Sequence, residues 1–500
     1  MPDKFHYARI TDAVHGTFGI SELESDIIST PVFQRLHNIR QLGLANLVYT
    51  GAEYSRFSHS LGACHIASRM LRGINQNSAK QFDDDEIQMY RLAGLLHDLG
   101  HYPFSHAMEY AALDYYKPQA FLADVPAPAA SVSGAPDAVV QIAAAPAAQA
   151  VAPDPPPPAY HHEQLGRAVL GNDKHIAEVL KKHRISSDDL KAVLSREKVG
   201  ALTNLVSSDL DCDRLDYLLR TAHCAGLPYG QVDLEYITTQ TCVDSEGYLC
   251  LTKKALRAAD HLLVSRYYDY TQVAFHKTIV ALELVLRNVI QELLERQLLD
   301  CSGATMLRMI TDGSFASFDD QYIIAQIRDA QKKLDPRDSL HLKIDSVLNR
   351  HPPKLVASSE SIASADEPTR KLHRNLDKQL RDKMREAAVK FKIAEPLWHP
   401  WNTSLGLTKI GSRIPLSEAT SGLFEEEASQ AVRVLTTEPD DKDCKSKPLV
   451  EHGFALMKLL SEYRFYAIRL FVHLPDGDTK LRTEIESFFK AELPDFPFSP

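Results

Sequence analysis

Cysteine is scarce and scattered in this chain. Its 500 residues include seven cysteines, an odd number, and no two of them are spaced as a CxxC pair. A disulfide framework or a cysteine-ligated zinc site needs paired or closely spaced cysteines. The sequence therefore argues against both and favours a reducing compartment, the cytoplasm.

The chain also lacks long apolar runs and an excess of positive charge. No stretch approaches the roughly 20 apolar residues that span a bilayer, and the N-terminal MPDKFHYARITDAVHG lacks the apolar core of a signal peptide. We therefore expect no association with a membrane. The formal net charge of −10 argues against a general nucleic-acid coat protein, since phosphate affinity is built from clustered Lys and Arg. Nucleic acid stays open as a partner, as does a local basic pocket for a small phosphate compound.

Helical periodicity dominates what is present. In RLAGLLHDLG, the residues Leu92, Leu95, Leu96 and Leu99 recur at i, i+3, i+4 and i+7, the spacing of one buried helix face. We predict an all-α fold with a few short strands and a mostly helical C-terminal region.

Two stretches interrupt the helical pattern. Residues 118–160 are rich in alanine and proline, so they have little apolar surface to bury, and we predict a flexible insertion. Residues 351–368 are predicted to be a loop or linker. The predicted domain parts are therefore 1–117 and 161–300, followed by a C-terminal region, 301–500.

A helix rich in lysine and arginine follows the second break. Leu372, Leu376, Leu380, Met384 and Ala388 recur at every fourth position. The pattern predicts a solvated charged face over a core stripe, and a surface for a partner or a nucleic acid is the alternative.

The segment GLLHDLGHYPFSH, residues 94–106, concentrates three histidines and an aspartate among apolar residues. His97 and Asp98 are adjacent, and Gly100 places them near a helix end, where neighbouring side chains can converge on one ion. Imidazole and carboxylate groups are ligands of divalent first-row metals. An isolated His-Asp doublet is more often two hydrogen-bonded core residues, so its surroundings decide.

Further polar residues lie on both sides of this doublet. Upstream, His59 opens an amphipathic helix in which Gly62 allows close backbone approach. Downstream, SSDLDCDRLDYLLR carries four aspartates beside a leucine stripe: Asp209, Asp211, Asp213 and Asp216. One histidine, the His-Asp pair and a distant aspartate would provide four protein ligands and leave positions for water and substrate.

These residues carry a family resemblance. The pattern H…HD…D, formed by His59, His97, Asp98 and Asp213, resembles the HD-domain phosphohydrolases. TPVFQRLHNIRQLG, FSHSLG, AGLLHDLGHYPFSHAME, HHEQ and DRLDYLL are similar to the dNTP triphosphohydrolase branch, which includes the SAM-and-HD-domain enzyme and its bacterial relatives. The resemblance covers roughly residues 5–290. It implies an HD-domain helical core, a divalent ion (Mn, Mg, Fe, Zn or similar) on those four residues, a nucleotide substrate and a homo-oligomer.

The resemblance also implies roles for other side chains. His106 and Glu109 share a helix face at i and i+3, where the carboxylate would orient the imidazole and stabilise its protonated form, making His106 a proton donor. His101 and His162 match positions that contact the phosphates near the scissile bond. The residues that match substrate contacts are Arg56, Gln41, Leu42, Arg214, Tyr217 and Arg266.

Four positions depart from the resembled branch. Thr221 stands where the relatives carry an Asp that holds the sugar 3′-hydroxyl, and Ala274 where they carry a Tyr packed on the sugar. Ser29 and His37 replace the Asp and the Arg of a site that reads an activating guanine. We therefore expect intact metal chemistry, weakened deoxyribose selectivity, and nucleotide activation that is altered or absent.

The favoured function is hydrolysis of dNTPs to deoxynucleoside and inorganic triphosphate. The alternatives are the same metal chemistry on another nucleotide or phosphoester, and a non-catalytic nucleotide-binding scaffold. An HD oxygenase of the di-iron type would need additional metal ligands that the sequence does not reveal. The pair His106 and Glu109 argues against the scaffold, because binding alone has no use for a proton donor.

Overall fold

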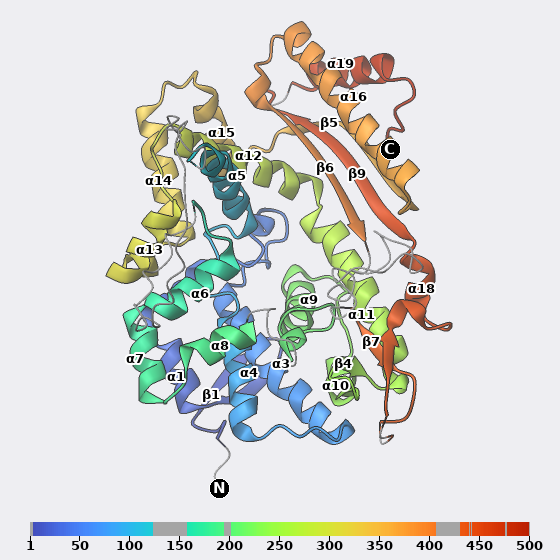
Figure 1. Cartoon of the computed structure of the whole chain (residues 1–500). Helices are drawn as coiled ribbons and strands as arrows, with labels where there is room; N and C mark the ends of the chain where they lie inside the picture. The colour runs from blue at the N-terminus through green and yellow to red at the C-terminus, as the bar shows by residue number, and fades with distance from the viewer. Residues whose placement is uncertain are drawn as a thin grey trace, which may run out of the picture.

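A computed structural model describes residues 4–123, 158–194, 202–406, 431–439, 441, 443–475 and 478–499. Helices dominate this part of the chain, and three small sheets accompany them (Figure 1). The fold is therefore mostly α rather than all-α, as the sheets of the C-terminal region show. No helix in these ranges is long and apolar enough to cross a membrane.

The first 350 residues form a helical core connected by short 3-10 turns. Its helices are α1 (Glu22–Ile28), α2 (Pro31–Gln34), α3 (Arg56–Asn77), α4 (Asp84–Leu96), α5 (His106–Ala123), α6 (His162–Asn172), α7 (Lys174–Lys182), α8 (Ser187–Leu194), α9 (Cys212–Ala225), α10 (Leu234–Thr239), α11 (Leu256–Asp269), α12 (Lys277–Glu295), α13 (Gly303–Asp312), α14 (Asp320–Lys333) and α15 (Ser339–Leu348). A π-helical turn, η5 (Tyr270–Ala274), follows α11 directly.

The three sheets lie at the margins of this core. Strands β1 (Ala8–Asp12) and β2 (Gly16–Ile20) form an antiparallel hairpin. A four-stranded sheet has the order β3 (Thr241–Val243), β4 (Leu249–Leu251), β7 (Arg433–Leu435) and β8 (Ser446–Pro448). A three-stranded antiparallel sheet has β9 (Tyr463–Val472) between β5 (Lys354–Ser364) and β6 (Trp398–Gly406).

The prediction of a linker at 351–368 was wrong. Lys354–Ser364 is the long strand β5, and it pairs with β9 from Lys354↔Val472 to Ser364↔Tyr463. The serine-rich sequence of β5 has little strand propensity of its own. Its partner, which lies about a hundred positions later in the chain, provides the hydrogen bonds that define the strand.

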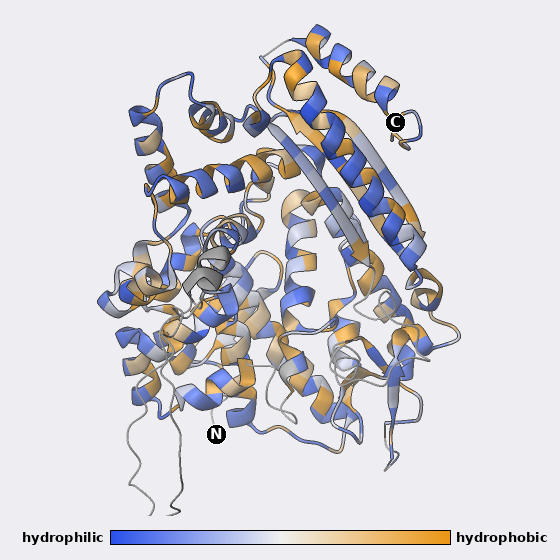
Figure 2. Cartoon of the chain, turned by 45° about the horizontal axis from the view of Figure 1, so that its top comes forward, coloured by the Kyte–Doolittle hydropathy of each residue, from blue (hydrophilic) through white to orange (hydrophobic). Residues whose placement is uncertain are grey.

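Helices α16 (Glu367–Phe391) and α19 (Thr479–Glu492) cover one face of this sheet (Figure 1). The inner face of α16 buries Leu380, Met384 and Ala388, while its outer face is hydrophilic (Figure 2). The predicted core stripe is thus present from 380 to 388, but Leu372 at its start is 57% exposed.

The opposite face of the sheet lies against α12. Phe471 of β9 packs on Val280 and Ala281. Arg469, also on β9, donates a hydrogen bond to the carbonyl of Phe275, which lies between η5 and α12. The C-terminal region therefore contacts the segment that leads from η5 into α12.

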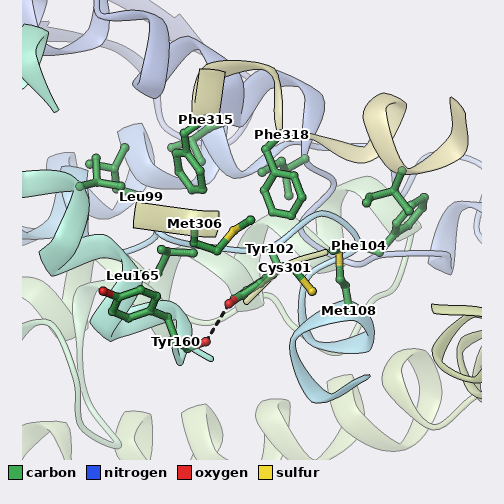
Figure 3. Close-up of a cluster of buried hydrophobic side chains, with 14 of the residues drawn as sticks. Leu99, Tyr102, Phe104, Met108, Tyr160, Leu165, Cys301, Met306, Phe315 and Phe318 are labelled. Carbon is green, nitrogen blue, oxygen red and sulfur yellow. Dashed lines mark hydrogen bonds between the residues drawn. The ribbon is translucent and has the colours of Figure 1, made fainter. Parts of the chain in front are cut away.

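The predicted leucine stripe of α4 forms part of the main buried cluster. Leu92, Leu95, Leu96 and Leu99 are each at most 1% exposed. Just beyond α4, the Tyr102 ring lies edge-on to Phe318 with centroids 6.2 Å apart, and Phe104 and Phe315 belong to the same buried cluster (Figure 3). These contacts anchor the turn between α4 and α5 in the core.

The predicted insertion lies largely outside the described residues. Helix α5 extends to Ala123, past the predicted boundary at 117. On the far side, Tyr160 is buried and its carbonyl accepts a hydrogen bond of 2.9 Å from the Tyr102 hydroxyl (Figure 3). The C-terminal end of this stretch is therefore attached to the turn after α4.

Candidate metal and phosphate site

Three helix ends bring His59, His97, Asp98 and Asp213 together. His59 lies in the first turn of α3, which Ser55 caps by accepting a hydrogen bond from the Ser58 amide. His97 caps the end of α4, and Asp213 lies in the first turn of α9. Because side chains at helix ends can point along the helix axis, residues from three helices converge on one position.

The ligand atoms of these residues have the spacing of a coordination sphere. His59 Nε2 lies 3.3 Å from His97 Nε2 and 3.0 Å from Asp213 Oδ1. His97 Nε2 lies 3.3 Å from Asp98 Oδ1 and 3.7 Å from Asp213 Oδ1. Two ligands at right angles on an ion, with bonds of about 2.1 Å, are about 3.0 Å apart.

The hydrogen bonds of both imidazoles aim lone pairs at the same point. His59 Nδ1 lies 2.7 Å from Asp216 Oδ2, and His97 Nδ1 lies 2.8 Å from the Gly94 carbonyl oxygen. Both partners are acceptors, so each Nδ1 carries a proton, and each Nε2 directs either a second proton or a lone pair at the shared point. When both Nε2 atoms are deprotonated, their lone pairs repel each other at this distance unless a cation lies between them. The residues present therefore fit a divalent metal ion.

The electrostatics of the site favour a positive charge at this point. Burial alone would lower the pKa of His59, but hydrogen bonds to Asp213 and Asp216 raise it to about 10. Burial would also raise the pKa of Asp98, yet the Arg56 guanidinium holds that pKa well below its usual range. Asp98 is therefore ionised, and the centre is negative enough to hold a cation.

The structure separates the roles of the four aspartates around α9. Asp213 faces the histidines, while Asp216 lies behind His59 and orients its ring. Asp211 caps α9 by accepting a hydrogen bond from the Arg214 amide. Asp209 accepts hydrogen bonds from the side chains of Arg214 and Arg266.

Glu109 is the centre of a second cluster. Its buried carboxylate lies 2.9 Å from His106 Nδ1 and 2.8 Å from His162 Nδ1, and it accepts a hydrogen bond of 2.8 Å from the His162 amide. Burial raises the pKa of Glu109, but these hydrogen bonds more than offset it and hold the pKa well below its usual range. Glu109 is therefore an ionised partner for two imidazoles. The structure thus brings together three of the residues assigned to catalysis by resemblance.

His101 connects the two clusters. Its Nε2 lies 3.3 Å from Asp98 Oδ1, and its ring stacks on His162 with centroids 4.1 Å apart. Burial and the nearby Arg56 hold its pKa well below the ordinary value, so the ring is neutral. Its Nδ1 is buried without a hydrogen-bond partner among the described residues, which leaves this atom to accept from a water or a hydroxyl group.

The turn that carries His101 and leads to His106 is strained. Phe104 and Ser105 have φ of 54° and 56°, in the left-handed region that residues other than glycine rarely adopt. Asp320 Oδ1 accepts a hydrogen bond of 2.7 Å from the Phe104 amide. Tertiary contacts therefore impose a backbone conformation that the local sequence does not favour.

Two glycines let the elements approach closely enough. A Cβ at Gly62 would lie 1.8 Å from Asp216 Oδ1, so glycine is needed where α9 meets α3. A Cβ at Gly100 would lie 2.1 Å from the Gly166 amide nitrogen and 2.2 Å from the His162 carbonyl oxygen. This second contact places the first turn of α6, and with it His162, against His101.

A cavity of about 400 Å³ opens over both clusters. Most of the residues assigned from the sequence line it: Gln41, Leu42, Arg56, His97, Asp98, His101, His106, His162, Asp213, Arg214, Tyr217 and Ala274. His59 and Glu109 are buried beneath its surface. Thr221 lies behind the wall, where its hydroxyl is 2.8 Å from the hydroxyl of Tyr54. Arg266 does not line the cavity itself but lies behind it, where it donates to Asp209 and lies over the ring of Tyr270 at 5.5 Å.

The sequence analysis missed four charged residues of the cavity wall. Two of them, Glu163 and Arg167, are i and i+4 on α6, so they share a helix face, and this spacing beside the HHEQ segment could have identified Arg167. Asp269 ends α11 and Glu283 lies on α12, and neither belongs to a recognisable motif. Burial raises the pKa of each of these two carboxyl groups to about 7.

The positions of the expected activator site lie apart from this cavity. Ser29 ends α1, and the ring of His37 stacks on Phe57 with centroids 3.5 Å apart. The Gln34 side chain donates a hydrogen bond to the Ile28 carbonyl. Altered or absent nucleotide activation stays a prediction.

Comparison with known proteins identifies the domain that holds the site. The family model of the HD domain matches residues 56–127, which include His59, His97, Asp98, His106 and Glu109. The chain carries an HD domain. It resembles the HD-domain phosphohydrolase superfamily, the dNTP triphosphohydrolases among them.

Relatives extend the match beyond the HD domain. An uncharacterized protein of Methanocaldococcus jannaschii is 30% identical over 322 residues, 64% of this chain and 57% of that protein. The deoxynucleoside triphosphate triphosphohydrolase SAMHD1 of Bos taurus is 40% identical over 111 residues, 22% of this chain and 19% of that protein. This chain spans about half the length of the curated relatives that it matches over its greater part.

A solved structure supports the fold. A phosphohydrolase from Bacteroides thetaiotaomicron superposes with a TM-score of 0.63 at 21% identity, over 93% of this chain and all of that chain. At this identity the likeness establishes the fold around the HD domain, C-terminal region included.

Proposed function

We propose that this chain is a metal-dependent phosphohydrolase that cleaves dNTPs to deoxynucleoside and inorganic triphosphate. One observation carries the proposal: the Nε2 lone pairs of His59 and His97 meet at one point, beside the His106–Glu109 pair, under a single cavity. Phosphoester hydrolysis needs charge neutralisation at the phosphate and an acid for the leaving group. We propose that the cluster around His59 and His97 supplies the charge neutralisation and that the His106–Glu109 pair supplies the acid.

The ion would be held by His59, His97, Asp98 and Asp213. When bound, a divalent ion supplies Lewis-acid charge that neutralises a phosphoryl oxygen and favours the ionisation of water. Asp216 and the Gly94 carbonyl fix both histidine rings in the tautomer that binds metal.

The proposed reaction consumes one water for each nucleotide. A bond forms between the water oxygen and the α-phosphorus, the bond from that phosphorus to O5′ breaks, and O5′ takes up a proton. His106 donates this proton, because it lines the cavity, its side chain is 53% exposed and its Nδ1 lies on the Glu109 carboxylate. The ionised Glu109 stabilises the protonated ring until the transfer.

The remaining phosphates need cations as they bind. Arg214 is paired with Asp209, so an incoming triphosphate has to compete with that carboxylate. Arg167 faces the same cavity from α6, with no carboxylate partner in the part of the chain that the structure describes. We assign Arg167 to the outer phosphates. As the resemblance implies, we also propose that the protein acts as a homo-oligomer.

A mixed panel of nucleotides, incubated with the metal-loaded protein, tests the proposed reaction. We expect inorganic triphosphate and deoxynucleoside in equal amounts. Stepwise release of single phosphates would mean a different phosphohydrolase, and no turnover of any nucleotide would favour the scaffold alternative.

A double variant ties the reaction to the metal site. Replacing His97 and Asp98 with Ala should abolish metal retention and turnover while leaving the helix content unchanged. The matched control is Asp345→Ala with His351→Ala, an exposed His–Asp pair at the end of α15, which should behave like the wild type. Full activity of the His97/Asp98 variant would contradict the HD-hydrolase mechanism.

A further inference from the structure

One wall of the cavity differs in its chemistry from the metal end. It is formed by the end of α11, by η5 and by the middle of α9, which contribute Asp269, Tyr270, Ala274 and Tyr217. We call these four residues the sugar wall. They include one carboxylate and none of the proposed metal ligands.

Asp269 is a carboxylate without a donor in this wall. It is the last residue of α11 and lines the cavity. Arg266, three residues earlier, directs its guanidinium to Asp209 Oδ1 at 3.2 Å and makes no hydrogen bond to Asp269. Burial raises the pKa of Asp269 to about 7, although the nearby charge of Arg266 opposes this rise. Such a group costs free energy unless a bound molecule supplies the donor.

Asp269 is the charged hydrogen-bond acceptor of the sugar wall, and two nearby residues add no competing acceptor. Thr221 is fully buried, and its hydroxyl is engaged with Tyr54. Ala274 presents only a methyl group to the cavity, in the turn that follows Asp269. The wall therefore combines a free acceptor with open space.

The sugar wall also lies where the sugar of a nucleotide would be. Tyr217 is one helical turn after the metal ligand Asp213, and the charge of Asp269 contributes to raising the pKa of both Tyr217 and Tyr54. In a nucleotide the sugar is joined directly to the α-phosphate. If that phosphate lies at the metal site, the sugar lies one step further along the cavity, beside this wall.

We infer that Asp269 accepts hydrogen bonds from the vicinal 2′- and 3′-hydroxyls of a ribose, so that ribonucleoside triphosphates belong to the substrates of this site. The inference rests on the proposed function and specifies which sugar the nucleotide substrate carries. A carboxylate has two oxygens for two adjacent hydroxyl donors, and carboxylates read ribose hydroxyls in dinucleotide sites in the same way. The space beside Ala274 accommodates the additional 2′-hydroxyl.

The test combines substitutions of Asp269 with substrates that lack the 2′-hydroxyl, the 3′-hydroxyl or both. Wild type, Asp269→Asn and Asp269→Ala are assayed for kcat/KM with ATP, 2′-deoxy-ATP, 3′-deoxy-ATP and 2′,3′-dideoxy-ATP, and with GTP as a second base. Asp269→Ala should lower kcat/KM about 10- to 100-fold for ATP, since hydrogen bonds to a charged acceptor have that strength. The loss should be smaller for each monodeoxy substrate and within about twofold for the dideoxy substrate. Asp269→Asn should fall between wild type and Asp269→Ala.

Glu283→Ala is the matched control. Glu283 lines the same cavity from α12, and its carboxyl pKa is raised to about 7 by the same burial. Removing it changes the charge of the cavity equally, so any effect on the polyanionic substrates should not depend on the number of sugar hydroxyls. Equal thermal unfolding temperatures of the variants exclude a general loss of folding.

Three outcomes would overturn the inference. The first is an equal loss of kcat/KM across the four sugars. The second is a loss of kcat/KM that differs between GTP and ATP but not among the four sugars. If the wild type hydrolyses none of these nucleotides, the proposed function fails by itself. Calorimetric binding of the same four nucleotides to wild type and Asp269→Ala then decides, and absence of any hydroxyl-dependent difference in affinity is the third outcome.

Discussion

Asp213 and Asp216 lie one helical turn apart on α9 and differ in what they contact. Asp213 faces His59 Nε2 and His97 Nε2, while Asp216 accepts from His59 Nδ1 on the other side of the ring. Asp216 also accepts hydrogen bonds from His15 and Arg220, so its position is fixed by the hairpin and the helix together. We therefore propose that Asp213 is a metal ligand and that Asp216 is a positioning residue.

We expect Asp216→Asn to weaken metal binding without removing a ligand. The amide is neutral and presents only one acceptor oxygen, so the His59 ring loses the partner that stabilises its metal-binding tautomer. Metal affinity, measured by competition with a chelator, should fall about 10- to 100-fold. Asp213→Asn removes a ligand and should have the larger effect. The reverse order would contradict this assignment.

In the proposed substrate complex, Ala274 leaves space in the cavity wall beside the sugar. We expect Ala274→Tyr to raise the ratio of kcat/KM for a dNTP to that for the matching ribonucleotide by about tenfold, because the ring fills the space that the 2′-hydroxyl needs. Changes in metal loading cancel in this ratio. Ala274→Ser keeps the space and should leave the ratio near that of the wild type. An unchanged or lower ratio for the tyrosine variant would show that this position does not face the sugar.

At the scale of secondary structure, the site is an assembly of helix ends. His59 and Asp213 lie in the first turns of α3 and α9, His97 caps the end of α4, and His106 and His162 begin α5 and α6. Amide groups at helix starts carry partial positive charge that suits a polyanionic substrate. The turn from Gly100 to Ser105 then sets the distance between the metal cluster and the Glu109 cluster.

In that turn, Gly100 lies directly against the backbone of α6. We expect Gly100→Ala to separate the Glu109 cluster from the metal cluster. A methyl group there meets the backbone of α6, so the helix has to move and His162 leaves its stacked position on His101. The free energy of unfolding should fall by about 1–3 kcal/mol, and kcat should fall more than metal affinity.

Gly171→Ala is the control on the same helix. A Cβ there would meet only the flexible end of Lys191, and alanine favours the helix, so stability should be unchanged or slightly higher. Chemical denaturation, a chelator competition and a turnover assay on both variants measure these effects. Equal behaviour of the two variants would show that α6 tolerates the displacement.

At the scale of the whole molecule, the C-terminal sheet supports the cavity wall. Arg469 of β9 donates to the carbonyl of Phe275, lies over the ring of Trp401 at 5.0 Å and forms an ion pair with Glu360 of β5. Phe275 follows η5 directly. Residues more than a hundred positions apart therefore position the segment that carries Ala274.

The junction between this sheet and the helical core should make stability depend on pH. His399 of β6 and His473, just after β9, lie with Nε2 and Nδ1 3.0 Å apart. Burial lowers the pKa of His473 from 6.5 to about 4 and that of His399 well below its ordinary value. Between these pH values the unfolded chain binds protons that the folded chain excludes, so lower pH favours unfolding.

The stability contributed by these two groups is complete above pH 6.5 and is lost as the pH falls toward 4. For His473 the loss is at most about 3 kcal/mol. We expect urea unfolding at pH 7.5, 6 and 5 to show this decline and His473→Gln to flatten it. His351→Gln, a change at an exposed histidine, should leave the slope as in the wild type. A slope that survives His473→Gln unchanged would assign the effect to other groups.

The alanine- and proline-rich stretch is predicted to contribute little to stability. Replacing residues 124–157 with a short Gly/Ser linker retains α5 as well as the contacts of Pro158 and Tyr160. The melting temperature should change by less than about 2 °C, because the replaced composition has no periodic apolar face to bury. A large decrease in a calorimetric scan would show that the stretch packs on the folded core.

Much of the HD domain was predictable because its signals are local. The leucine stripe of α4, the histidine spacings and the cluster of aspartates are properties of short segments, and helix periodicity converts such spacing into shared faces. The His106–Glu109 pair and the close approach at Gly62 could therefore be proposed from the sequence, and the family resemblance implied the metal ligands. The same reasoning described the inner face of α16 over residues 380–388.

Only the tertiary structure decided what depends on contacts between distant segments. Strand β5 exists because β9 pairs with it, and its serine-rich sequence has no strong preference of its own. The engagement of Thr221 by Tyr54 and the exposure of Asp269 and Arg167 to one cavity follow from how helices pack. Packing depends on the sum of many small contacts across the chain, and no single segment encodes it.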